Sequence, residues 1–176
     1  MPLLQPTKDF LRYLQRNPSA RAQIRAAPGR TLLYAGAFFR PIWQEIELAK
    51  QRDPQLAHKE MLPEVLARIR LPGAPHASLL AWAQALDAQQ PWKDNGFIAW
   101  RALSGIFAAN AVGAVSFCVG SPVTAANKVF AATEVSVLAR NPTVDATTRD
   151  LVAYFQRCIQ TGQEHINLGF IAGQPS

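Results

Sequence analysis

The sequence predicts an all-α fold, with an irregular helical N-terminal half and a C-terminal helical region that contains one long apolar helix, a candidate to span a membrane. Three observations lead to this prediction. Proline and glycine divide the 176 residues into helix-length pieces. There is no long period-2 alternation with β-branched enrichment, so strands are not indicated. Residues 102–127 hold no charged side chain, although 17% of the chain is charged.

The N-terminal half is expected to form short helices separated by prolines. Thr7 is the predicted N-cap of the first helix, because Thr is favoured at that position, and residues 17–18 (Asn-Pro) end this helix. The apolar stretch 32–39 is interrupted by Pro41, since proline lacks the donor that a helix needs. Residues 53–54 (Asp-Pro) combine an N-cap with proline at the first helical position, which predicts another helix start.

Clearer helix boundaries mark the second half. Residues 71–75 (Leu-Pro-Gly-Ala-Pro) form the strongest break in the chain and a candidate hinge. Asp94 is the predicted cap of a long helix that starts near Phe97, and Asp145 precedes a last helix closed by Gly162. These breaks divide the chain into a basic N-terminal arm (1–40), short helices with a proline-rich hinge (41–75), a helical core or membrane region (76–162) and a C-terminal tail (163–176).

Residues 102–120 are predicted to form one continuous helix, because this window is uncharged and mostly apolar. A spanning helix needs about 20 such residues, so the length of the window is just sufficient. Trp100 and Arg101 stand at one end, where an aromatic and a basic side chain favour a membrane interface. Small residues dominate the window, however, and a buried central helix of a soluble bundle has the same pattern. Both interpretations stay open at this stage.

Gly105, Ala109 and Gly113 recur every four residues and are the predicted helix-packing residues. Small side chains at that spacing let the backbone of another helix approach closely. Asn110 lies near the middle of the window, and in a membrane its amide needs a hydrogen-bonding partner. The pattern therefore predicts a partner helix along this face.

The net charge is +6, and the whole excess lies in residues 1–40, where seven Lys or Arg face a single Asp. Arg12 and Arg16, like Arg21 and Arg25, are four residues apart, so each pair shares one helix face. We expect these four arginines to contact an acidic partner or a layer of anionic lipid headgroups. An organellar import signal, a nucleic-acid-binding arm and a solvated basic face are the alternative interpretations.

No motif for catalysis, cofactor binding or metal binding occurs, so we expect no such site and no enzyme activity. Residues 58–60 (His-Lys-Glu) have the H-x-E form of the zinc deaminases, but no P-C-x-x-C follows. The pair Glu164 and His165 is the best remaining acid–base candidate, and a polar C-terminal tail is the alternative interpretation.

Residues 139–142 (Ala-Arg-Asn-Pro) are similar to the polar loop between the two helices of the ATP synthase proton-ring subunit. In that family, a fully apolar helix bearing one carboxylate follows the loop. Here Arg149, Asp150 and Arg157 follow instead, so the next segment does not fit the second membrane helix of that family. We therefore assign no ion-carrying role and no family membership.

Together, the basic arm, the uncharged window and the absent motifs predict a non-catalytic accessory subunit of a larger organellar membrane complex. A respiratory or ATP-synthase complex of the mitochondrial inner membrane is the expected setting, with other protein subunits and anionic lipid as partners. One alternative is a soluble, cytoplasmic all-α adaptor or immunity-type inhibitor. Another is an organellar ribosomal or nucleic-acid-associated protein, which is disfavoured because the chain beyond residue 40 is charge-balanced.

Overall fold

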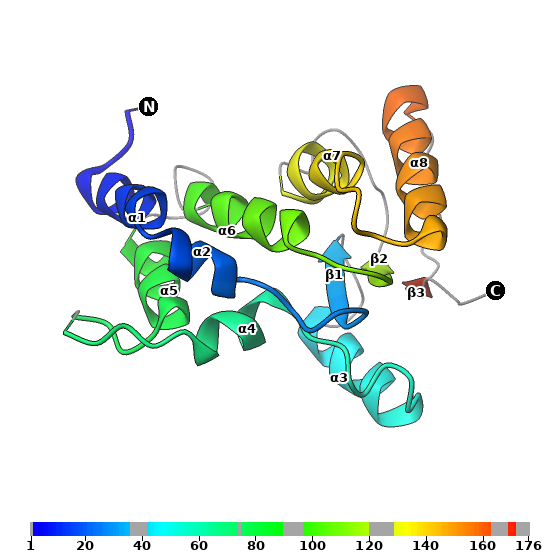
Figure 1. Ribbon diagram of the computed structural model, residues 1–176, viewed down its shortest axis with the longest axis horizontal. Coiled ribbons are helices and arrows are strands. Elements are labelled where there is room, and N and C mark those ends of the chain that lie inside the picture. Colours follow the sequence, from blue (N-terminus) through cyan, green and yellow to red (C-terminus); the bar gives the residue numbers. More distant parts are fainter. Residues whose placement is uncertain are drawn as a thin grey trace.

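A computed structural model describes residues 2–35, 42–73, 75–89, 97–119, 129–162 and 169–171 (Figure 1). The helices of the first half are α1 (Gln5–Arg16), α2 (Pro18–Gln23), α3 (Ile42–Arg52), α4 (Leu62–Arg68) and α5 (Leu79–Gln89). The second half holds α6 (Phe97–Ala109), the π-helical turn η2 (Phe130–Glu134), α7 (Val135–Leu138) and α8 (Ala146–Thr161). Three short strands complete the fold, β1 (Thr31–Ala35), β2 (Val115–Val119) and β3 (Gly169–Ile171).

The strands form one sheet in the order β1-β2-β3, so the all-α prediction is wrong. β1 runs parallel to β2, with Thr31 opposite Val115 and Ala35 opposite Val119, and β3 runs antiparallel to β2. All five side chains of β2 are buried, as are four of the five in β1. A strand covered on both faces is a continuous apolar run without alternation, and such a run cannot be told from a buried helix by its pattern.

The window 102–120 is not one continuous helix. α6 ends at Ala109, and β2 begins at Val115. Between them Gly113 adopts a positive φ of 75°, a conformation that favours glycine and interrupts regular structure. Across the described part of the chain, no helix has both the length and the apolar character needed to cross a bilayer, so the predicted membrane-spanning helix is wrong as well.

Some helix boundaries follow the sequence and others do not. α6 is described from Phe97 onward, and its predicted cap, Asp94, lies outside the described residues. α8 begins after Asp145, whose carboxylate accepts a hydrogen bond of 2.8 Å from the backbone N–H of Thr148. α8 also ends as predicted at Gly162, which is left-handed. The prediction for Thr7 is wrong, because α1 begins earlier and buries Thr7 in its first turn. Asp53 starts a turn instead of a helix.

The central strand β2 separates two apolar clusters. On one face Phe117 contacts Phe130 of η2 and Phe155 of α8, with ring centroids 6.2 and 5.2 Å apart. The smaller cluster on the other face consists of Leu32, Ile46, Met61 and Cys118. In Figure 1, α1 and α5 lie at one end of α6, whereas the strands and α8 lie at its other end. α6 therefore connects the N-terminal helices to the sheet.

Candidate functional site

The outer side of α6 lines an open groove with a volume of about 610 Å³. α1 contributes Leu11, α6 contributes Ile106, and α7 contributes Val137 to its apolar lining. Arg101 and Arg140, both exposed, are its only charged lining residues among those that the structure describes. The groove thus combines apolar surface with two cations, and no described carboxylate lines it.

The turn η2 packs tightly against α6 beside this groove. A Cβ atom added at Gly105 would lie 3.3 Å from the Cγ2 atom of Thr133, so the absence of a side chain at this position allows the approach. The Arg101 Nε–H donates a 2.8 Å hydrogen bond to the Thr133 hydroxyl. This bond orients the Arg101 guanidinium, and the exposed part of the guanidinium keeps further donors for an acceptor outside the chain.

On the opposite side of the contact between α6 and η2, Glu134 is only 5% exposed. The Ser104 hydroxyl hydrogen-bonds to its carboxyl group, while its Oε2 atom has no hydrogen-bond partner among the described residues. Burial raises the pKa of Glu134 to about 8, because the charged form loses its hydration, and the Ser104 bond opposes that shift only in part. Tyr34 is partly buried, and this burial, followed by the nearby Glu134 charge, raises its pKa to about 12.

A π-helical turn places Glu134 in this interior position. The backbone N–H of Glu134 donates to the carbonyl of Val129, and that of Val135 donates to Phe130, so both bonds span five residues. Such turns insert one residue into a helix and occur frequently at functional sites. Glu134 does not line the groove, whereas its neighbour Thr133 does. The two features therefore lie on opposite sides of one α6–η2 contact.

Of the three predicted helix-packing residues, Gly105 and Ala109 line the groove together. Gly113 lies apart from them, in the loop that follows α6. Its N–H donates to the carbonyl of Thr143 and its carbonyl accepts from Asp145, at 2.9 and 3.0 Å. The three residues therefore do not share one helix face. Gly105 and Ala109 lie on the surface of α6, and Gly113 lies in a loop whose backbone bonds to residues 143 and 145.

The four predicted contact arginines differ in their surroundings. Arg12 pairs with Asp9 at 3.2 Å on the surface of α1. The Arg21 guanidinium donates to the carbonyls of Leu14 and Gln15, so it caps the end of α1. Arg16 and Arg25 are exposed, and the structure gives their side chains no hydrogen bond or ion pair with a described residue. These two retain the full capacity to bind an anionic partner.

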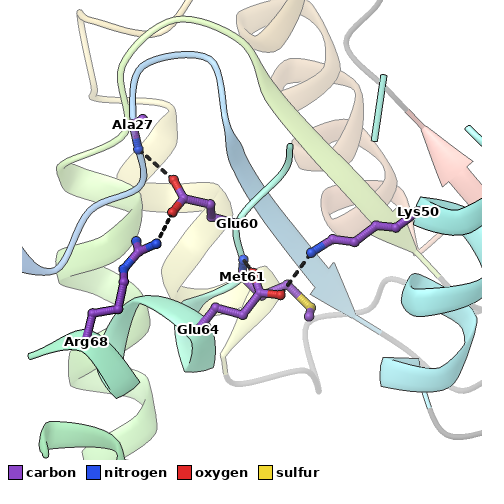
Figure 2. Close-up of polar contacts among 6 residues, drawn as sticks. All are labelled: Ala27, Lys50, Glu60, Met61, Glu64 and Arg68. Atoms are coloured by element: carbon purple, nitrogen blue, oxygen red, sulfur yellow. Dashed lines mark hydrogen bonds and ion pairs between the residues drawn. The ribbon is translucent and has the colours of Figure 1, made fainter. Parts of the chain in front are cut away.

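Glu60, the last residue of the His-Lys-Glu sequence, links the segment at Ala27 to Arg68 of α4 (Figure 2). Its carboxylate accepts a 2.9 Å hydrogen bond from the Ala27 backbone N–H and pairs with Arg68. Partial burial raises the pKa of Glu60, but the Ala27 bond and the charge of Arg68 outweigh burial and hold the pKa below its ordinary value. Figure 2 also shows Glu64, which accepts from the Met61 N–H and from Lys50, both at 2.9 Å.

No chemical role is assigned to the remaining acid–base and metal-ligand candidates. Glu164 and His165 lie outside the described residues. His58 is exposed, and within the described ranges no three His, Cys, Asp or Glu side chains gather as a metal site. Comparisons with protein-family models, with curated proteins and with solved structures found no match to any of them. The groove and the buried carboxyl therefore have to be interpreted on their own chemistry.

Sequence reasoning does not find the groove, because its lining comes from segments as far apart as Leu11 and Arg140. Glu134 does carry a signal, since it is the only acidic residue between positions 95 and 144. A single carboxylate within so apolar a stretch is expected to be buried and to have a perturbed pKa.

Proposed function

We propose that the protein is a non-catalytic accessory subunit that binds other protein subunits of a larger assembly. The observation that carries this proposal is the groove along α6, whose lining combines apolar surface with two exposed arginines. Apolar surface of this kind, bordered by polar groups, is typical of interaction sites. Arg16 and Arg25 support the same function, because neither side chain is engaged within the described structure.

The setting of the assembly is the second part of the proposal. An organellar complex at the mitochondrial inner membrane, of respiratory or ATP-synthase type, agrees with the basic, acid-poor N-terminal arm. Anionic lipid headgroups are then additional partners of that arm. An adaptor, an immunity-type inhibitor and a nucleic-acid-associated protein are the competing functions, and the size and composition of the native assembly distinguish them.

The test is the native size of the full-length protein in an extract of its source cells. We expect it to elute far above its own mass of 19.3 kDa, with the same protein partners in each peak fraction. The double variant Arg16→Glu/Arg25→Glu should shift the protein toward the free fraction. Arg70→Glu/Arg149→Glu, at two exposed arginines elsewhere on the surface, is the matched control and should leave the profile unchanged.

Elution of the wild-type protein as a free monomer would contradict the proposed function. A large assembly that collapses on ribonuclease treatment would instead favour the nucleic-acid-associated alternative. Binding to one soluble protein, in a small complex that contains no other subunit, would favour the adaptor or inhibitor.

A further inference from the structure

The walls of the groove determine what backbone its occupant can have. α1, α6, η2 and α7 are helical, so the backbone N–H and C=O groups of the walls are largely paired within their own helices. An extended peptide would find no strand edge there, and its own backbone groups would stay unpaired in an apolar site. A helix satisfies its backbone internally, so a helix suits this groove better than an extended segment.

The side chains of α6 favour the same occupant. Ile98, Ala102, Gly105 and Ala109 line the groove at the spacing of a single helix face. Ala102 and Ala109 are small, so a second helix can approach the α6 backbone closely there, whereas the space beside Gly105 is taken by Thr133 of η2. Leu11 and Ile106 provide larger apolar side chains against which the apolar face of that helix can pack.

The charges determine which helix fits. Arg101 and Arg140 border the groove, and Lys8, three residues before Leu11, is exposed on the same face of α1. No described Asp or Glu lines the groove to balance them. The chain itself carries a net charge of +6, so a second copy would bring further positive charge to a basic surface. Charge complementarity therefore requires an acidic partner.

We propose that this groove docks an acidic amphipathic helix of a partner protein. Its apolar face packs on Ala102 and Ala109, and flanking Glu or Asp side chains pair with Arg101 and Arg140. This inference rests on the proposed function, because it names the kind of segment through which another subunit binds.

The probe is a synthetic three-heptad helical peptide with leucine at the two core positions of each heptad and glutamate beside them. Its fluorescence anisotropy is measured while full-length protein is added. We expect saturable binding that weakens as salt is raised, since surface charges are screened within about 10 Å at 0.1 M ionic strength. A peptide with lysine in place of every glutamate should bind at least roughly tenfold more weakly, because like charges then face each other.

Two variants place the peptide in the groove, and each has a matched control. Ala109→Leu adds bulk where close approach is expected, and the control Ala88→Leu makes the same change on the exposed surface of α5. Arg140→Glu reverses a charge beside the groove, and Arg149→Glu does so on α8. We expect each groove variant to weaken binding by roughly tenfold, as loss of a central contact does, while the controls bind like the wild type. Circular dichroism and the melting temperature show that all four variants are folded.

Equal binding of the acidic and basic peptides would overturn the proposal, and so would equal effects of the groove and control variants. Binding to phosphatidylglycerol vesicles, with no binding to the acidic peptide, would identify the surface as a lipid site and overturn it too. A native assembly that forms normally with Ala109→Leu and with Arg140→Glu would refute helix docking and leave the accessory-subunit function standing. A free monomer in the source extract would instead remove the accessory-subunit function itself.

Discussion

The two halves of the window 102–120 have similar apolar character but different structures. Residues 102–109 are helical, whereas residues 115–119 form the central strand of the sheet. The helical half is rich in alanine, the residue with the highest helix propensity. The strand half, Val-Ser-Phe-Cys-Val, is rich in residues that pack well in sheets. Apolar length alone therefore does not distinguish one long helix from a helix followed by a strand.

The end of the helical half is held by side chains from a distant segment. The Asn141 amide donates to the carbonyls of Ala108 and Ala111 at 3.0 and 2.9 Å, and the Thr143 hydroxyl donates to Ala111 at 2.7 Å. Asn110 in turn donates to the carbonyls of Arg21 and Ile24. The bonds from Asn141 and Thr143 satisfy carbonyl groups at the end of α6, and those from Asn110 satisfy carbonyl groups at the end of α2. The helix-to-strand break is therefore stabilised by tertiary contacts.

The largest effect is expected in the strand half. Phe117 is fully buried against Phe130 and Phe155, so Phe117→Ala leaves a cavity among three rings. We expect a loss of about 3–5 kcal/mol in the free energy of unfolding, measured by urea denaturation. Val112→Ala, at a residue 41% exposed between the two halves, is the control and should cost less than about 1 kcal/mol. A loss at Phe117 as small as at Val112 would mean that β2 is not the centre of the core.

A pH dependence is expected from the buried Glu134 carboxyl, which Ser104 of the helical half contacts. The folded protein raises the pKa of Glu134 from 4.5 to about 8, so it binds the proton more tightly than the unfolded chain. Stability should therefore fall as pH rises from about 5 to 8, by an amount on the order of a few kcal/mol. Glu134→Gln, which is neutral at every pH, should remove this loss and be more stable than the wild type at pH 8.

The measurement is the urea midpoint of both proteins at pH 5 and pH 8. Glu47→Gln, at an exposed carboxyl of α3, is the matched control and should keep the wild-type pH dependence. An unchanged pH dependence in Glu134→Gln would show that the carboxyl is hydrated in solution.

A third prediction compares two glycines, Gly105 in the helical half and Gly113 in the break between the two halves. Gly113 has a φ of 75°, and a Cβ atom there would lie 3.4 Å from the backbone N of Gly29, so Gly113→Ala should cost about 1–2 kcal/mol. Gly105 is helical, and alanine there gains helix propensity but contacts Thr133 at 3.3 Å, so Gly105→Ala should change stability by less than about 1 kcal/mol. Thermal denaturation of both variants tests which one loses more stability. Equal losses of stability would mean that the two glycines have similar backbone conformations.

The smallest effect is expected from substitutions at two buried serines. Ser104 in the helical half hydrogen-bonds to Glu134, whereas the Ser116 hydroxyl in the strand half has no partner among the described residues. Ser104→Ala should cost about 1 kcal/mol, and Ser116→Ala should be neutral or slightly stabilising, because an unpaired buried hydroxyl contributes nothing favourable. Urea midpoints measured at pH 8 check the difference. A larger loss at Ser116 would reveal a partner for its hydroxyl.

Sequence reasoning succeeds here where the signal is local. The cap at Asp145 and the left-handed Gly162 each act within a few residues, and both boundaries are confirmed. It fails at β1 and β2, because a strand covered on both faces loses its alternation. It fails also at Gly113, where the third member of an apparent helical stripe is a loop residue that approaches Gly29. The groove and the buried position of Glu134 depend on contacts among distant segments, which spacing alone does not reveal.

The parallel pairing of β1 with β2 has a consequence for how the chain is made. Thr31 pairs with Val115, so the ribosome must add about 80 residues after β1 before its partner strand exists. At about 5–20 residues per second, the apolar residues of β1 wait roughly 4–16 s without that cover. During this interval β1 lacks the strand that pairs with its full length, and such a segment is prone to associate with other chains. Binding of a chaperone to this N-terminal segment during translation is the expected protection.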